Sequence, residues 1–342
     1  MDSTMGGPQD AGLLEAGRRL GHDLCRMTRW ERDAGWPTAV LEGFDEALHR
    51  RPGRGGADRF ERKWLQLRLS ALARGRLVAD DVTPDLLREL DIEVCPVTRR
   101  RLTHGAQGPD DWSVDRLNND GAYAAGNLAL MSAMANRAKG TRGFDEVLAL
   151  AGAPHATHGL RPDAWRRLAA LMLGPAFVDR PRAAPLLPLC APLPCRSVRL
   201  GVQQIQRLFT VHARQQSGKN QLIRRFRASC PSQAALWRLE ALAEALHQAF
   251  KSLDAEEEPW DVWLRPSTLE ALARWNDALG ERGQRLAVRL AGEWSSATRE
   301  SPVTLRTWSL ATGGYASRAA GAVGTGADLP IRPAPRPSLS AS

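Results

Sequence analysis

Residues 113–140 read SVDRLNNDGAYAAGNLALMSAMANRAKG, and this stretch decides the fold that we expect. The short run that ends at Asp115 and the run of residues 128–131 predict two strands. Residues 118–121 predict the turn between them, because Asn, Asp and Gly tolerate a positive φ. Ser132 is a residue type that caps helices, so a helix should begin directly after the second strand. The stretch therefore predicts a β-hairpin followed by a helix.

Several polar side chains of this stretch would meet once the hairpin and the helix pack together. Asn136 and Lys139 lie on adjacent turns of the expected helix. Asp115 ends the first strand, so the fold would bring a carboxylate to an amide from a different element. Hard divalent cations such as Mg²⁺ prefer oxygen ligands of these types. We therefore expect Asp115 and Asn136 to hold one divalent cation.

The stretch also contains a set of short motifs in a fixed order. The motifs are Cys95-Pro96-Val97-Thr98, Ser113-Val114-Asp115-Arg116-Leu117-Asn118-Asn119, Gly121-Ala122-Tyr123, Gly126-Asn127 and Asn136-Arg137-Ala138-Lys139. In this order and spacing they resemble the HNH endonuclease family, whose fold is named ββα-metal. The closest likeness is a subgroup with Asp-Arg where most members have Asp-His. The resemblance covers about residues 92–145.

The resemblance implies a role for each matching position. Asp115 and Asn136 would be the metal ligands, and Asn127 would brace the loop between the strands. Arg137 and Lys139 would grip the phosphate backbone of DNA. The basic run that follows Cys95 lies beside the expected site and could contact phosphates as well; it consists of Arg99, Arg100 and Arg101. The implied activity is metal-dependent hydrolysis of DNA phosphodiester bonds, with Mg²⁺ or another divalent cation as cofactor.

Arg116 stands where most members of the family have the histidine that activates water. Arginine stays protonated near neutral pH and has no acceptor, so it cannot take that proton. It could hold the scissile phosphate with its forked donors instead. Three alternatives follow: another base such as His104 acts, metal-bound water attacks with little help, or the site binds DNA without cutting it. His104 could instead be a solvated loop residue near Gly105 and Gly108, and that interpretation is the favoured one.

Structural zinc is not expected. Several members of the family hold a zinc ion with two Cys-x-x-Cys motifs, but here Thr98 follows Cys95 and no cysteine stands at the second place. Met131 and Met134 occupy that second place and should be core residues. Cys190 and Cys195 lie in a Pro-rich run and are expected to be two unpaired thiols.

The composition of the whole chain favours a soluble cytoplasmic protein with a polyanionic partner. The chain has 342 residues, a net charge of +9 and only five scattered cysteines, which fits a reducing compartment. Forty-three of its 47 basic residues are arginine, and the four lysines are Lys63, Lys139, Lys219 and Lys251. No apolar run approaches the roughly 18 residues that a membrane helix needs. The charge favours a polyanion, and the resemblance implies that this partner is DNA; no membrane contact is expected, and protein partners stay open.

Apolar residues at helical spacing predict a mostly α-helical protein around the small ββα module. We expect an N-terminal helical region over residues 1–91 and the HNH-like module over residues 92–150. A helix and a Pro-rich connector should follow over residues 151–200, with the helix ending near residue 173. A C-terminal helical region should span residues 201–318, and residues 319–342 should form a disordered tail rich in Gly, Ala, Pro and Ser.

Three functions remain open from the sequence. The first is a divalent-metal-dependent HNH-like endonuclease that hydrolyses DNA. The second is a catalytically degenerate protein that binds DNA through the ββα module, which the substitution at Arg116 suggests. The third is an adaptor whose helical regions bind protein partners. The joint presence of Asp115, Asn127 and Asn136 favours the first.

Overall fold

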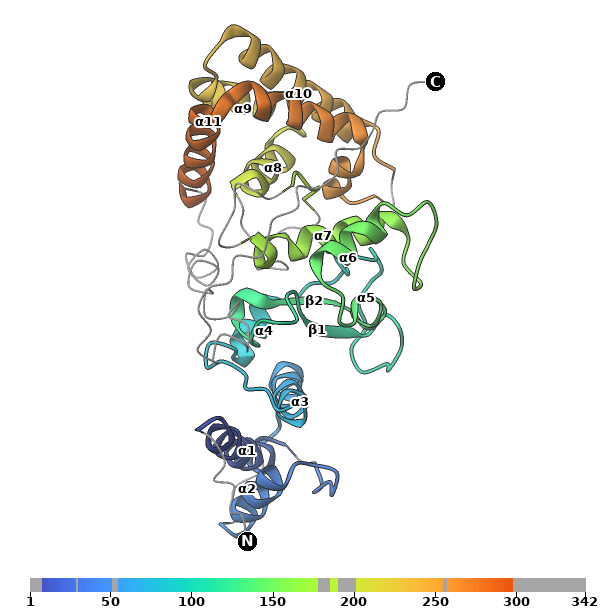
Figure 1. Cartoon of the computed structure of the whole chain (residues 1–342), viewed down its shortest axis with the longest axis vertical. Coiled ribbons are helices and arrows are strands. Elements are labelled where there is room, and N and C mark those ends of the chain that lie inside the picture. The colour runs from blue at the N-terminus through green and yellow to red at the C-terminus, as the bar shows by residue number, and fades with distance from the viewer. Residues whose placement is uncertain are drawn as a thin grey trace.

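A computed structural model describes residues 8–28, 30–50, 55–177, 185–189, 201–254 and 257–297. Within these ranges the protein is mostly α-helical and has one two-stranded sheet, so the prediction of a mainly α protein is confirmed. Figure 1 shows the helices near the N-terminus at one end of the molecule and α8–α11 at the other, with the sheet between them. None of the described helices has an apolar stretch long enough to cross a membrane.

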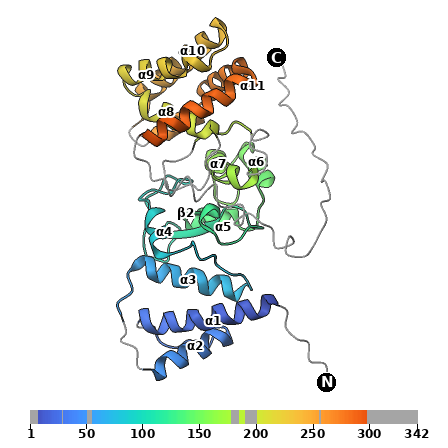
Figure 2. The ribbon, with the colours of Figure 1, turned by 90° about the vertical axis from the view of Figure 1, so that its left-hand side faces the viewer.

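Three helices form the N-terminal end of the molecule: α1 (Pro8–Met27), α2 (Thr38–His49) and α3 (Arg59–Ala73). Their shared core contains Leu24, Phe44 and Leu65, all of them buried. Asp58 caps α3 through the backbone amides of Phe60 and Glu61. The other side of α3 packs on the central core, because Leu67 and Ala71 belong to that core. The described part of residues 1–91 therefore contributes to two cores. Figure 2 shows α3 between α1 and α2 on one side and the central part of the molecule on the other.

The predicted hairpin and helix are confirmed. Strand β1 (Trp112–Arg116) pairs antiparallel with β2 (Leu128–Ser132), and the register places Val114 opposite Leu130. Helix α5 (Ala133–Lys139) begins directly after β2, and the Ser132 hydroxyl accepts a hydrogen bond from the Ala135 amide as an N-cap. We call these three elements the β1–β2–α5 unit.

The loop between the strands turns where the sequence predicts a turn, but for a different reason. The Asn118 side chain accepts a hydrogen bond from the Asp120 amide at 3.0 Å, and the Gly121 amide donates to the Asn118 carbonyl. None of residues 118–121 has a positive φ. The turn is therefore held by the side chain of Asn118, and the expectation that it uses left-handed backbone was wrong.

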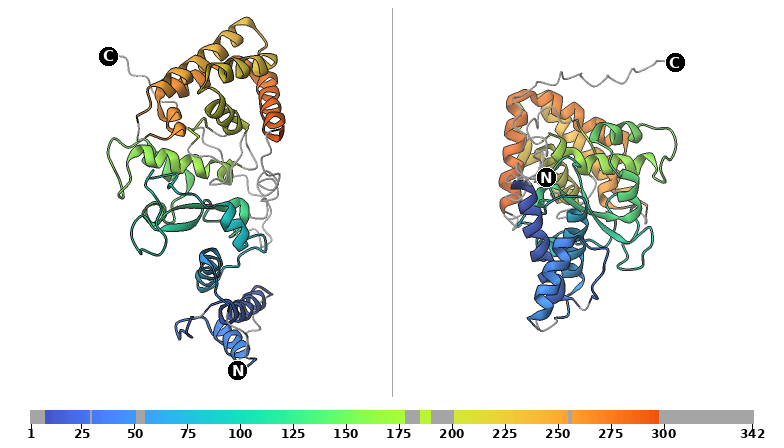
Figure 3. Two further views of the ribbon diagram at one scale, coloured as in Figure 1. Left: turned by 180° about the vertical axis from the view of Figure 1, so that it is seen from behind. Right: turned by 60° about the horizontal axis from the view of Figure 1, so that its bottom comes forward.

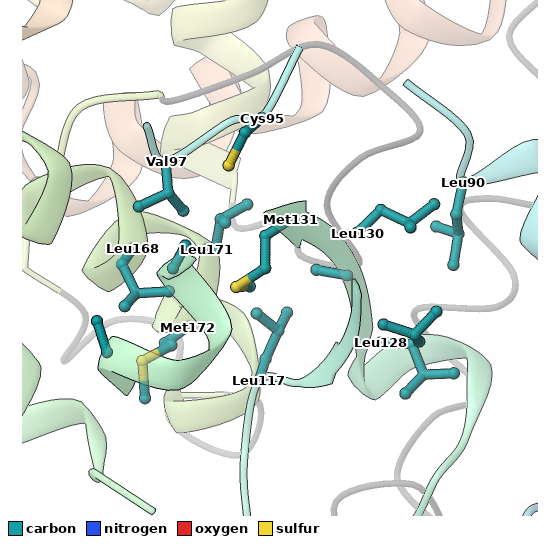
Figure 4. Packing of buried hydrophobic residues seen from close by; sticks show 14 of the residues in the cluster. Leu90, Cys95, Val97, Leu117, Leu128, Leu130, Met131, Leu168, Leu171 and Met172 are labelled. Atoms are coloured by element: carbon teal, nitrogen blue, oxygen red, sulfur yellow. The ribbon is translucent and has the colours of Figure 1, made fainter. Parts of the chain in front are cut away.

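The core under the sheet draws on segments from both sides of the unit in the sequence. Figure 4 shows Leu90, Cys95, Val97 and Met131 around this core, together with Leu168, Leu171 and Met172. Helix α4 (Pro84–Glu89) closes one side of it, and the Thr83 hydroxyl caps that helix at the Leu86 amide. Helices α6 (Phe144–Ala151) and α7 (Pro162–Phe177) close the other. Helix α7 runs past the end predicted near residue 173.

The C-terminal helices form a separate core. It is built from α8 (Gly201–His212), α9 (Gln216–Phe226), α10 (Gln233–Lys251) and α11 (Pro266–Ala297), with short 3₁₀ helices η3 (Arg227–Ser229) and η4 (Pro259–Leu264). Phe209, Phe226 and Trp275 pack against one another at its centre, with ring centroids 5.5–5.9 Å apart. Helix α11 bends at Gly280, whose φ of 59° lies outside the helical region. Figure 3 shows this bundle from behind.

Three sequence predictions concern residues outside the described ranges, wholly or in part. Cys190 and Cys195 lie there, and so does the tail of residues 319–342. Most of the predicted connector lies there too, apart from residues 174–177, which belong to α7, and residues 185–189.

Candidate functional site

The two predicted metal ligands face the same interface, which lies between β1 and α5. Side chains alternate along a strand, so Ser113 and Asp115 point to one face of β1. The Asn136 side-chain amide donates to the Ser113 hydroxyl at 2.7 Å, and Lys139 Nζ lies 3.0 Å from Asp115 Oδ2. Asn136 and Lys139 are three residues apart on one face of α5. The structure therefore brings Asp115 and Asn136 to one side of the hairpin.

Lys139 is a structural cation at this interface. Its side chain has 0% of its surface exposed. Its ammonium donates to the Arg116 carbonyl at 2.7 Å and to the Asn119 side-chain oxygen at 3.0 Å, and it forms the ion pair with Asp115. Two of the three ammonium donors make these hydrogen bonds, and the contact with Asp115 is an ion pair without a well-formed hydrogen bond. The prediction that Lys139 grips a phosphate is corrected: this lysine faces inward and ties β1 to the turn and to α5.

The Asp115 carboxylate is buried and incompletely compensated. Burial raises the pKa of Asp115 to about 6, although the charge and hydrogen bonding of Lys139 lower it. Asp115 Oδ2 is buried without a well-formed hydrogen bond, so the 3.0 Å contact with Lys139 is an ion pair of imperfect geometry. Because desolvation outweighs the lysine, the carboxylate would gain from a further cation.

The donors at this interface fit one hard divalent cation with few protein ligands. Asp115 offers a carboxylate, and Asn136 offers its side-chain oxygen because its nitrogen donates to Ser113. Among the described residues no three His, Cys, Asp or Glu side chains gather as a metal-binding group. Mg²⁺ commonly binds through one or two carboxylates and takes its other ligands from water and substrate phosphates. Such an ion would therefore depend on water and substrate for most of its ligands.

Arg116 points away from Asp115 and braces the turn. Its neighbouring position on β1 places its side chain on the other face of the strand. The guanidinium donates to the carbonyls of Asn119 and Gly121 at 2.9 and 3.0 Å and lies 4.6 Å from the Tyr123 ring centroid. These contacts fix the loop that follows β1. They hold Arg116 away from the place where a base beside Asp115 would act.

His104 also lies on the far face of β1. Its ring stacks edge-on against Trp112 with centroids 5.0 Å apart, and Trp112 is three positions before Asp115 on the strand. Partial burial and the nearby Arg59 lower the pKa of His104. Since alternate strand residues face opposite ways, His104 is not brought to Asp115. We therefore do not retain His104 as the general base.

Asn127 has the bracing position that the resemblance implies. It is fully buried at the end of the 3₁₀ turn η1 (Ala125–Asn127). Its side-chain oxygen accepts from the Asn118 amide at 2.8 Å, and its nitrogen donates to the carbonyls of Asn118 and Ala122. One side chain thus closes the loop between the two strands. It does not contact the Asp115 carboxylate.

The predicted phosphate-binding arginines have different environments. Arg137 is exposed on α5, and its Nε donates to the Ala133 carbonyl of its own helix. Arg101 is exposed, and Arg100 is exposed but ion-paired with Asp110 at 2.6 Å. These three remain open to a phosphate or can exchange a partner for one.

Arg99 is the exception, because it forms a nearly buried ion pair. Its NH2 lies 2.7 Å from the Asp261 carboxylate in η4, and both side chains have little exposed surface. Arg167 of α7 joins the same carboxylate at 3.3 Å and donates to the Val97 carbonyl. This group, which we call the Asp261 clasp, ties the turn after Cys95 to the C-terminal helices. The prediction that Arg99 binds phosphate is corrected accordingly.

The Cys95 turn packs directly against the start of α5. Cys95 is fully buried, and its Sγ accepts from the amides of Ser132 and Thr98 at 3.2 and 3.4 Å. Met131 is fully buried beside it, which confirms its predicted place in the core (Figure 4). Met134 is partly buried against the same core. The sulfur is therefore part of the packing between this turn and β2.

Sequence reasoning missed two contributors to the site. Ser113 could have been found, because it alternates with Asp115 on β1 and must share its face. Asp261 could not, because 162 residues separate it from Arg99.

Comparisons with known proteins add no assignment: no family model matches the chain, and neither a curated protein nor a solved structure matches it significantly.

Proposed function

We propose that the protein is a divalent-metal-dependent, HNH-like endonuclease that hydrolyses DNA phosphodiester bonds at the β1–α5 interface. The observation that carries the proposal is the position of Asp115. Its carboxylate is buried, shares an interface with the Asn136 amide and keeps a raised pKa despite the adjacent Lys139. This is the setting in which a further cation is favoured. The motif resemblance over residues 92–145 supplies the reaction class.

In this proposal different residues of the chain hold the ion, position its ligands and bind the DNA backbone. Asp115 and Asn136 would hold the ion, which would polarise the phosphate and make bound water more acidic. Lys139 and Asn127 position the ligands by fixing the strand and the turn. Arg137 is exposed on α5, Arg101 is exposed in the segment before β1, and both would neutralise backbone phosphates. No described residue beside Asp115 is assigned as a general base.

The charge balance at the interface predicts how the ion would be recruited. Asp115 and Lys139 together carry no net charge when both are ionised. The buried carboxylate attracts a cation but the adjacent ammonium repels it, so a divalent ion would bind this pair weakly alone and would need the negative charge of a phosphate as well. We infer that the cation and the DNA bind together, each raising the affinity of the other.

A second candidate function is DNA binding without cleavage. Two contacts favour it: the Lys139 ammonium already pairs with Asp115, and the Arg116 side chain is committed to the turn. Both leave the β1–β2–α5 unit intact as a rigid scaffold for basic surface residues. The two candidates differ only in whether the unit cuts what it binds.

The deciding experiment incubates supercoiled plasmid with the protein in Mg²⁺ or Mn²⁺, with and without chelator, and measures binding to the same DNA in parallel. Nicking that stops when chelator is added supports the endonuclease. Binding that persists with no nicking in either ion supports the second candidate. Absence of both binding and nicking contradicts both.

A further inference from the structure

A basic groove lies beside α5, on the flank that does not face β1. Its volume is about 380 Å³, and the described residues that line it are Pro109, Met134, Arg137, Ala138 and His158. None of these residues is acidic. Figure 1 shows α5 next to α6 and α7, and His158 belongs to the segment that connects those two helices. His158 lies outside residues 92–145 and has no place in the motif resemblance.

His158 is held in an unusual backbone conformation. Its φ is 49°, which places a non-glycine residue in the left-handed region. The flanking residues Thr157 and Leu160 form a bridge, with both backbone hydrogen bonds at 2.9 Å. The next residue, Gly159, also has a positive φ. Non-glycine residues in this region cost free energy and cluster at sites of function. The tight loop therefore holds an exposed imidazole at the edge of the groove.

The Arg142 guanidinium is held against the His158 imidazole. Arg142 NH2 lies 2.9 Å from His158 Nε2, and Arg142 NH1 donates to the Ala138 carbonyl at the end of α5. The guanidinium is therefore anchored to the helix and oriented toward the histidine. Because a guanidinium only donates, His158 Nε2 is the acceptor of this contact, and Arg142 adds its positive charge beside the groove that Arg137 lines. An anion in the groove would be favoured by the two guanidinium groups and could accept a hydrogen bond from the other ring nitrogen of His158.

The remaining lining residues indicate which anion fits. Met134 and Pro109 give the groove an apolar wall next to its basic residues. A sugar–phosphate backbone offers the same alternation, because apolar sugar faces separate its charged phosphates. The forked donors of Arg137 and Arg142 match the geometry of a phosphate. Helix α5 also carries Asn136 on its β1 face, so a strand in the groove would pass close to the candidate metal site.

We propose that this groove, lined by Arg137 and His158 with Arg142 held against His158, binds a backbone phosphate of a DNA strand. The choice of DNA over a free phosphate rests on the proposed function, whereas the anion site itself rests on the groove alone. The groove would hold a phosphate next to the one at the β1–α5 interface. It would thereby fix the register of the strand on the unit.

The first test uses inorganic phosphate and no metal. The imidazole resonances of the wild-type protein are followed by NMR in chelator while phosphate replaces chloride at constant ionic strength. His158→Asn identifies the His158 signal, and Asn suits this position because it tolerates a positive φ. We expect the His158 signal to shift with phosphate while that of exposed His155 does not. An unchanged His158 signal overturns the anion site.

The second test uses a fluorescent DNA duplex in the same chelating buffer. We expect His158→Asn and Arg137→Gln each to weaken binding by roughly 3- to 10-fold at low salt, and Arg137→Gln to reduce the salt slope by about 1. His155→Asn, three residues earlier in the same loop, is the matched control and should bind like wild type. The DNA assignment is overturned if the control variant also binds more weakly, or if His158→Asn binds as tightly as wild type.

Because neither test measures cleavage or contains metal, their failure is distinct from failure of the endonuclease proposal. If phosphate shifts the His158 signal but the duplex does not displace the bound phosphate, the groove binds free phosphate and the DNA assignment is wrong.

Discussion

Lys139 Nζ lies 3.0 Å from Asp115 Oδ2, and the lysine side chain has no exposed surface. The pair joins the first strand of the hairpin to the last turn of α5. The pair also bears on whether the interface binds a metal ion or only supports the fold. The buried lysine orients the carboxylate, and it also competes with a metal ion for that carboxylate.

Removal of one partner of this buried pair should be strongly destabilising. Lys139→Met leaves the buried Asp115 charge, the Arg116 carbonyl and the Asn119 side-chain oxygen without their partner, which should cost about 3–5 kcal/mol of the free energy of unfolding. Arg137→Met, on the exposed face of the same helix, should change it by about 0.5 kcal/mol or less. Urea unfolding of both variants measures the difference. Equal stabilities would show that Lys139 does not support the fold.

The raised pKa of Asp115 predicts a pH-dependent stability. A carboxyl with a pKa of about 6 when folded and 3.8 when unfolded binds its proton more tightly in the folded state. Its stabilising contribution is therefore full below about pH 4 and is lost as the pH rises through 6. The loss is on the order of 3 kcal/mol for a shift of this size.

The measurement compares wild type with Asp115→Asn by urea unfolding in chelating buffer between pH 4.5 and 7.5. The stability of wild type relative to the variant should fall over this range. A difference that stays flat, or that grows with pH, would mean that Asp115 is ionised throughout and is well compensated by Lys139.

The Asp261 clasp should hold the C-terminal helices on the central core. Asp261→Asn leaves Arg99 and Arg167 facing each other with a neutral partner, so the free energy of unfolding should fall by about 3–5 kcal/mol. Asp254→Asn, at an exposed site in the segment that precedes η4, serves as control and should be nearly neutral. Calorimetry also reports whether the two cores then melt separately. A single unshifted transition in Asp261→Asn would contradict the coupling.

Local patterns predicted the β1–β2–α5 unit well, because each step depends on neighbours in the sequence. Ser132 caps the helix that follows it, and Asn118 turns the chain through its own side chain. The position of His104 was not accessible in this way, because motif order alone does not say which face of the hairpin a loop residue meets. Arg116 could have been placed, since β1 extends through it and alternation turns it away from Asp115.

Burial was the second quantity that the sequence did not provide. Lys139 lies on a short helix of mixed polarity, and such a lysine is normally exposed. Only the packing of α5 on β1 turns its ammonium inward. Arg99 was misjudged for the same reason, since the carboxylate that buries it comes from η4, far along the chain.

Joint recruitment of cation and DNA gives a thermodynamic prediction. Mn²⁺ should bind the free protein weakly. Its affinity should rise when an uncleavable phosphorothioate duplex is present, by roughly 5- to 150-fold, which is the range typical of coupled sites. Water-proton relaxation or electron paramagnetic resonance measures the bound Mn²⁺. The enhancement should vanish in Asp115→Asn. Tight Mn²⁺ binding without DNA would contradict the charge balance that we infer for the pair.

The most direct test of the proposed function is the rate of plasmid nicking in Mg²⁺ by wild type, Asp115→Asn and the control Asp120→Asn, whose side chain is exposed in the turn. We predict that wild type and Asp120→Asn nick at similar rates. Asp115→Asn should be slower by roughly 100-fold or more, because it weakens the site for the ion. Nicking by Asp115→Asn at the wild-type rate, or no nicking by a wild type that still binds the plasmid, would contradict the account.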